Sequence, residues 1–177
     1  MDSGAARGNN VPANALFRVS RSMDKIDRRI LDLLQREGEL TAAEIAERIG
    51  LTKTPCWRRI QRLKETGVIR HTAALLDPKA LNVGTTVFVT VKTANHSAAW
   101  FERFMKAVQG LPEVVEIYRM SGDVDYLMRI VVPDIDTYDA VYKKLIASVE
   151  FLDVSASFAL ETLKSTTALP LDYLWLT

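Results

Sequence analysis

The sequence predicts an α+β chain of two modules, a helical one followed by one of alternating strands and helices. Apolar residues recur at helical spacing up to about residue 65, whereas from Gly84 they alternate in short runs typical of strands. Charge is also uneven: residues 1–80 hold 15 Lys and Arg against 10 Asp and Glu, and residues 81–177 hold 8 against 12. The expected boundaries are 1–22 for a tail, 23–84 for the first module and 85–177 for the second.

Composition limits where such a chain can work. No stretch approaches the ~18 uncharged apolar residues that a membrane span needs, so no membrane partner is expected. A single cysteine, Cys56, allows no disulfide within the chain, which favours a cytoplasmic protein. The basic first module suits a polyanionic partner and the acidic second module does not.

The tail of residues 1–22 is rich in Gly, Asn and Ala and has no periodicity, so we expect it to be flexible. An alternative is a basic arm that touches DNA, because Arg7, Arg18 and Arg21 have no acidic neighbours after Asp2.

The first module predicts three helices. Asp24 begins the first, and Gly38 stands where a left-handed residue would end it. Thr41 and Glu44 form a capping box that begins the second helix. Gly50 then makes a sharp turn into a third helix, which Thr52 or Thr54 caps. The apolar stripes of the first two helices are Ile26, Ile30, Leu33 and Leu34, and Ile45, Ala46 and Ile49.

Two short helices around a glycine turn, the second of them basic, are typical of a helix-turn-helix, either winged or plain. The extended segment expected from Val68 to Leu76 then leaves the module. In the third helix, Cys56, Ile60 and Leu63 form the buried stripe, so we interpret Cys56 as a core residue and not a reactive thiol. The candidate DNA-binding residues are Thr52, Lys53, Thr54, Arg58, Arg59 and Arg62.

The chemistry of these candidate residues suits DNA. Arginine can form two hydrogen bonds with guanine or grip a phosphate, and the start of a helix offers free N–H groups to phosphate. Trp57 has two interpretations: its ring shields the turn between the helices, or it packs on a sugar.

The second module has the order βαββαβ, which is the ferredoxin-like arrangement. Strands are expected at 86–92, Val114–Met120, Tyr126–Val132 and Val154–Leu163, with helices between them that begin near Ser97 and Asp134. Two helices can cover only one face of such a sheet. We therefore expect the other, apolar face to pair with a second copy in a dimer or a larger ring, and residues 164–177 to dock on a neighbouring surface.

Residues 23–174 resemble the Lrp/AsnC, or feast/famine, family of prokaryotic transcription regulators. The resemblance rests on the first helix at 24–31, on Thr54-Pro55-Cys56 in the recognition helix, on the link Ala74–Pro78 and on the Gly-Asp-x-Asp-Tyr turn at 122–126. It is greatest to the L-cysteine-responsive branch, through Trp57, His96-Ser97 and Ser157-Phe158-Ala159. Related branches respond to leucine, asparagine, lysine, proline and other amino acids.

The resemblance implies a DNA-binding protein that responds to a small amino acid and assembles as dimers, then tetramers or octamers. The effector would lie at the 122–126 turn, at a contact between dimers, completed by the last strand of a neighbour. Acidic oxygens of the turn would meet the ammonium, and main-chain N–H groups the carboxylate. The alternative is that both acids only fix the turn. The candidate effector-binding residues are Gly122, Asp123, Asp125, Tyr126, Ser155, Ser157 and Phe158.

No catalytic, metal or cofactor site is expected. His71 and His96 are the only histidines, and neither has metal-ligand spacing with Cys56. No Gly-rich phosphate loop is found. Two alternatives to the ligand-controlled regulator remain at this point: an architectural protein that wraps DNA without ligand control, and an enzyme or an enzyme's regulatory subunit.

Overall fold

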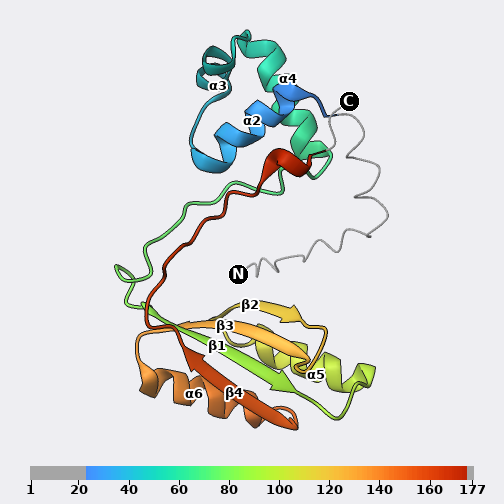
Figure 1. Ribbon diagram of the computed structural model, residues 1–177, viewed down its shortest axis with the longest axis vertical. Coiled ribbons are helices and arrows are strands. Elements are labelled where there is room, and N and C mark those ends of the chain that lie inside the picture. Colours follow the sequence, from blue (N-terminus) through green and yellow to red (C-terminus); the bar gives the residue numbers. More distant parts are fainter. Residues whose placement is uncertain (1–22, 175–177) are drawn as a thin grey trace, which may run out of the picture. The chain divides into compact units, whose positions relative to one another are not determined.

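The computed structural model describes residues 23–174 and divides the chain into two compact units (Figure 1). Of the described residues, the helical unit contains residues 23–74 together with residues 165–174, and the α/β unit is Leu75–Lys164. The expected tail of residues 1–22 lies outside the described residues. The unit boundaries differ from the expected 23–84 and 85–177, because the C-terminal residues pack with the helices.

The helical unit is built from α2 (Lys25–Arg36), α3 (Ala42–Ile49) and α4 (Lys53–Glu65). The short 3-10 helix η2 (Leu171–Tyr173) belongs to the same unit. Each helix contributes its predicted apolar stripe to one core. The buried core residues are Met23, Ile30, Ile45, Ala46, Ile49, Cys56, Ile60 and Leu63.

The predicted helix starts are confirmed in detail. The Asp24 side chain accepts hydrogen bonds from the backbone of Ile26 and Asp27, and the Asp27 side chain accepts one from the backbone of Asp24. Thr41 and Glu44 form the expected capping box. Gly50 ends α3 with φ of 72°, a left-handed conformation that suits glycine and turns the chain into α4.

One local prediction was wrong. Gly38 is not in the left-handed region, because α2 ends at Arg36 with Glu37 as its cap. A Cβ atom at Gly38 would lie 3.3 Å from the methyl group of Thr72, so a close approach of the chain favours glycine there. Residues 66–74 form no strand, so of the two forms left open, winged or plain, the described part of the unit has the plain one, without a wing hairpin.

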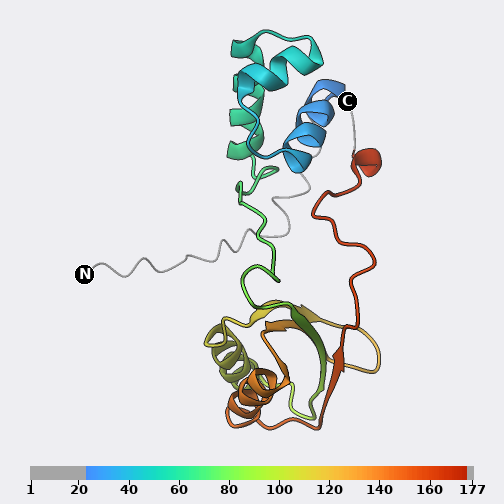
Figure 2. The same ribbon diagram turned by 90° about the vertical axis from the view of Figure 1, so that its left-hand side faces the viewer.

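The α/β unit has the predicted ferredoxin-like order. Its elements are β1 (Thr85–Lys92), α5 (Ala98–Gln109), β2 (Val114–Arg119), β3 (Tyr126–Val132), α6 (Ile135–Ile146) and β4 (Asp153–Phe158). The sheet order is β2-β3-β1-β4 and every neighbouring pair is antiparallel. Figure 2 shows α5 and α6 together on one side of this sheet.

The covered face of the sheet forms the second core. Val87, Val89 and Val91 are fully buried beneath the helices, so the residues between them lie on the opposite, open face. On the open face Phe88 is 41% exposed and Tyr118 is 51% exposed. The α/β unit therefore presents apolar side chains on the face that no helix of its own covers.

The last strand is shorter than the predicted Val154–Leu163. The amide of Ala159 donates to the carbonyl of Thr86 at 2.9 Å, and β1 has no residue beyond Thr85 with which a longer β4 could pair. After this bond the chain leaves the sheet and reaches the helical unit at Ser165.

Candidate DNA-binding and effector sites

The first turn of α4 is exposed and basic. Thr52 is the N-cap residue and its side chain makes no capping hydrogen bond, while Lys53 and Thr54 are exposed beside it. No acidic residue lies in this turn, unlike the first turns of α2 and α3, which hold Asp27 and Glu44. The free N–H groups and the positive end of the helix dipole are therefore available to a phosphate.

Arg58 lies on the exposed face of α4, one turn after Thr54. The side chain of Arg58 makes no hydrogen bond or ion pair with any of residues 23–174. Trp57 beside it is 52% exposed, which is high for a tryptophan. A ring in this position has a free surface for a second molecule.

Arg59 and Arg62 do not share this face, although the sequence placed them with Arg58. Arg59 pairs with Asp24 at 2.7 Å and with Asp27 at 2.9 Å, and Arg62 pairs with the second Asp27 oxygen at 2.5 Å. The Asp27 side chain is fully buried, so the two arginines neutralise a carboxylate that would otherwise be costly. Three residues apart, they point to the flank of α4 that meets α2.

The acid–base chemistry of this cluster matches its geometry. Burial alone would raise the pKa of Asp24, but hydrogen bonds from the Asp27 backbone and from Arg59 outweigh it and hold the pKa below its usual value. Cys56, expected in the core, is fully buried, and burial raises the pKa of its thiol. The thiol therefore stays protonated and poorly reactive.

The candidate effector turn is held by its two acids in different ways. Gly122 has φ of 104°, which lets the chain reverse. The Asp125 carboxylate accepts a hydrogen bond from the backbone of Thr93 at 2.8 Å, while Asp123, 92% exposed, pairs with the Lys92 ammonium at 2.8 Å. Asp125 thus fixes the turn to the end of β1, and Asp123 has oxygens free for a ligand.

Negative charge gathers around Lys92. The hydrogen bond with Asp123 is the largest cause that raises the pKa of Lys92, and the charges of Asp123, Asp153 and Asp125 add to it. All three carboxylates thus favour a positive charge at the end of β1.

The other candidate effector residues do not gather at one point. In β4, Ser155 and Ser157 pair with Thr90 and Phe88 of the open face. Phe158 pairs with Val87 and packs edge-on against Tyr138 of α6, with ring centroids 5.3 Å apart, so it faces the helices.

Tyr126 is 6% exposed and stacks with Trp100, so it is a core residue. Its side chain therefore anchors the end of the turn in the core. Sequence reasoning missed Lys92 and Thr93 as members of the turn. Both lie at the end of β1, and only the pairing of β1 with β3 brings them to the turn.

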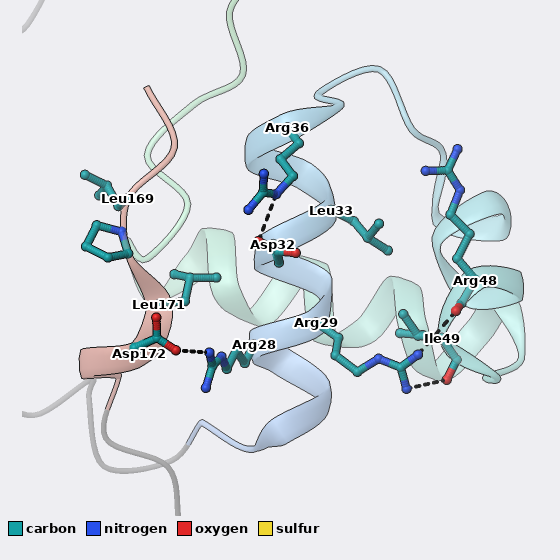
Figure 3. Close-up of a pocket in the computed structure, with 11 residues that line it drawn as sticks. Arg28, Arg29, Asp32, Leu33, Arg36, Arg48, Ile49, Leu169, Leu171 and Asp172 are labelled. Atoms are coloured by element: carbon teal, nitrogen blue, oxygen red, sulfur yellow. Dashed lines mark hydrogen bonds and ion pairs between the residues drawn. The ribbon is translucent and has the colours of Figure 1, made fainter. Parts of the chain in front are cut away.

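A further cavity of about 460 Å³ lies in the helical unit (Figure 3). Its wall is basic, but Arg28, Arg36 and Arg48 each pair with a carboxylate, and Arg29 donates to the carbonyls that end α3. These charges are satisfied within the unit. The C-terminal residues that close one side are Leu169, Pro170, Leu171 and Asp172.

No group of three or more His, Cys, Asp and Glu side chains is placed to hold a metal ion in residues 23–174. Among the same residues no helix has the length and hydropathy of a membrane span.

Comparison with known proteins agrees with this geometry. Residues 23–70 match the winged helix-turn-helix DNA-binding family model, and residues 86–169 match the Lrp/AsnC ligand binding domain. The chain is 47% identical over 151 residues to the DNA-binding transcriptional activator DecR of Escherichia coli K12, covering 85% of this chain and 99% of that protein. The glutamate uptake regulatory protein of Zymomonas mobilis is also 47% identical, over 85% and 92% of the two chains.

Solved structures give the same result. An AsnC family transcriptional regulator from Agrobacterium tumefaciens is 57% identical, with a TM-score of 0.83 over 86% of this chain and 99% of that one. The regulator NMB0573 of Neisseria meningitidis, solved in complex with L-Met, is 35% identical with a TM-score of 0.82 over the same shares. These relatives are named as regulators, and DecR as a DNA-binding transcriptional activator. The basic helix, the ligand-binding fold and these relatives together show that the chain is a DNA-binding, amino-acid-responsive transcription regulator, and it belongs to the Lrp/AsnC family.

Proposed function

We propose that α4 enters the DNA major groove with Arg58 and Trp57 facing the bases and sugars, and with Thr52, Lys53 and Thr54 on phosphates. The observation that carries this is the exposed first turn of α4, which is cationic and free of acidic residues. Arg59 and Arg62 then act behind this surface by holding α4 on Asp27. Sequence preference would come mainly from Arg58, because phosphate contacts carry no base information.

Replacement of Arg58 tests this assignment. Arg58→Ala should weaken binding to a duplex selected from a random pool by about tenfold or more, since a good arginine–base contact is worth ~1–3 kcal/mol. Lys106→Ala, which removes a cation from the last turn of α5, serves as the control. Equal affinity of the Arg58→Ala variant and the wild type in fluorescence anisotropy titrations would place DNA on another surface.

We further propose that the effector is a free α-amino acid bound beside the 122–126 turn. Its ammonium would meet the exposed Asp123 carboxylate within the negative cluster around Lys92. Its carboxylate would take turn N–H groups and the hydroxyl groups of Ser155 and Ser157, supplied by a neighbouring copy. The relatives' names point to different amino acids, L-Met in one and glutamate uptake in another. L-Cysteine stays a hypothesis that rests on the resemblance alone.

A melting-temperature panel of free amino acids identifies the effector. An amino acid at ~100 times its dissociation constant should stabilise the folded protein by ~2.7 kcal/mol. Asp123→Asn should remove this shift. The matched control is Asp139→Asn, which breaks an exposed ion pair with Lys143 on α6 and leaves the turn residues unchanged. A shift that persists in the Asp123→Asn variant would exclude this carboxylate from the site.

The assembly that we propose is a dimer formed through the open face of the sheet, with dimers joined into tetramers or octamers. The exposed Phe88 and Tyr118 on that face support it. A dimer would present two copies of α4 to a pseudo-palindromic DNA site. The cytoplasm is the location that we propose for such a regulator.

A further inference from the structure

The C-terminal segment, defined here as residues 165–174, is seated on α2 through paired polar contacts. The Gln35 amide donates to the Leu169 carbonyl at 3.1 Å and accepts from the Leu169 amide at 2.9 Å. One turn of the segment later, Asp172 pairs with Arg28 at 2.5 Å. Figure 3 shows the segment beside α2, with Asp172 directed at Arg28.

The contact residues of the segment have the same spacing as their partners on α2. Arg28 and Gln35 are seven residues apart, so they lie on one side of α2 about 10.5 Å apart. The three steps from Leu169 to Asp172 can span up to about 10 Å. The segment therefore runs antiparallel to α2, and its contact residues match those of the helix in spacing. The segment residues that are partly buried recur at every third position, at Ala168, Leu171 and Leu174.

The same contacts are open to water. The Asp172 side chain is 79% exposed, and Leu169 is 72% exposed. An exposed ion pair and two accessible hydrogen bonds hold the segment weakly, so a small change can alter the fraction of molecules in which it is docked.

The segment also follows closely after β4, the strand that carries the candidate effector residues Ser155 and Ser157. The last sheet bond of β4 is the one from Ala159 to Thr86, and the helical unit is rejoined at Ser165. The intervening residues 159–164 can span only about 20 Å. The strand before them carries Ser155 and Ser157, so a change at the end of β4 reaches the segment through a short link.

We propose that the C-terminal segment is a second, releasable attachment of the DNA-binding unit, and that effector bound beside β4 changes how often it is docked on α2. The effector part rests on the proposed function of the turn and of β4. When the segment is docked, the helical unit is joined to the α/β unit by two connections. When it is released, only the connection that follows α4 remains, and the helical unit samples more orientations.

A helical unit that samples fewer orientations should bind more tightly to DNA with two half-sites. The reason is that a dimer then loses less conformational entropy when both of its α4 helices bind at once. Binding to a single half-site gains nothing from the attachment. The ratio of the two affinities therefore reports docking.

The test compares the full-length wild type with a Gln35→Leu/Asp172→Asn double variant. The control is Arg36→Gln, which breaks an exposed ion pair with Asp32 on α2 and leaves the segment contacts intact. The probes are a duplex selected from a random pool by the wild type and a duplex with one of its half-sites scrambled. Hydrogen exchange of the Leu169 amide measures docking directly.

The double variant should lose Leu169 protection, keep the protection of core amides such as Leu63, and bind the two-half-site duplex ~10-fold more weakly with unchanged half-site affinity. Charge alone predicts the opposite, since Asp172→Asn makes the unit more positive. Lost protection with unchanged or tighter two-half-site binding would overturn the attachment. An unprotected Leu169 amide in the wild type would overturn it as well.

The coupling to the effector is tested with whichever free amino acid raises the wild-type melting temperature. Addition of this amino acid should change the exchange rate of the Leu169 amide in the wild type and leave the DNA affinity of the double variant unaltered. An unchanged rate at saturation would overturn the coupling to β4. If no amino acid raises the melting temperature, the proposed effector role itself fails, and the two-duplex comparison alone still decides the attachment.

Discussion

At the scale of single residues, Asp27 explains how α4 is oriented. Its side chain is fully buried and accepts hydrogen bonds from the Asp24 amide, from Arg59 and from Arg62. A buried carboxylate needs such partners, so α4 cannot rotate on α2 without leaving a charge unpaired. Arg59 and Arg62 thus stabilise the fold, and Arg58 is the arginine of α4 that we propose for DNA contact.

Replacement of Arg59 should therefore affect stability more than replacement of Arg58. Arg59→Met removes the one arginine that pairs with both Asp24 and Asp27, and it should lower the free energy of unfolding by ~2 kcal/mol. Arg58→Ala, the matched control on the exposed face, should stay within ~0.5 kcal/mol of the wild type. Urea unfolding followed by circular dichroism measures both. Equal stability of the two variants would contradict the role given to Asp27.

The lowered pKa of Asp24 predicts a dependence on pH. Because the folded pKa lies below the ordinary value of 3.8, the unfolded state binds protons more readily, and the charged carboxylate stabilises the fold. That contribution is fully present above about pH 5 and is lost as pH falls through the folded pKa. The stability difference between wild type and Asp24→Asn should therefore be constant near neutrality and shrink below about pH 5. A difference that grows on acidification would contradict the assignment.

At the scale of elements, the starts of helices were the most predictable feature. The helix start at Asp24, the capping box at Thr41 and the turn at Gly50 depend on neighbours in the sequence, so the sequence alone identifies them. The seat of the C-terminal segment was not predictable in this way. Gln35 and Leu169 are 134 residues apart, and nothing local in either stretch indicates the other.

The direction in which the Arg59 side chain points was also not predictable from the sequence, although it concerns a single helix. Periodicity separates the core stripe of α4 from the remaining faces, but it does not tell which of those faces meets α2. The identity of the partner, a buried Asp27, decides it. The candidate effector residues divide for a similar reason, since one step along β4 moves a side chain from the open face at Ser157 to the helix face at Phe158.

The turn between α3 and α4 gives a prediction at this scale. Gly50 has φ of 72°, and a Cβ atom added to it would meet no other atom within 4 Å, so Gly50→Ala introduces backbone strain without a clash. The cost should be ~1 kcal/mol of unfolding free energy, measured by urea unfolding. Gly50→Asn should recover part of it, because asparagine tolerates this conformation better. If the asparagine variant were no more stable than the alanine variant, strain would not be the cause.

At the scale of the whole molecule, the uncovered face of the sheet is the surface that we propose for self-association. Phe88 on the open face and Phe101 on α5 are exposed to nearly the same degree, 41% and 43%. Phe88→Lys should lower the sedimentation coefficient towards that of a monomer at micromolar concentration, because it places a charge in the proposed dimer contact. Phe101→Lys should leave it unchanged. Dissociation by the second substitution and not the first would move the contact to the helical layer.

The burial of Cys56 has a practical consequence for measuring the molecule. The thiol is the chain's single cysteine, and it lies in the core of the helical unit. A thiol reagent can therefore modify the native protein only when that unit opens, and the labelling rate reports the free energy of this opening. DNA and the C-terminal segment should slow the labelling wherever they hold the helices together. The labelling rate of this one native thiol thus reports the local stability of the DNA-binding unit.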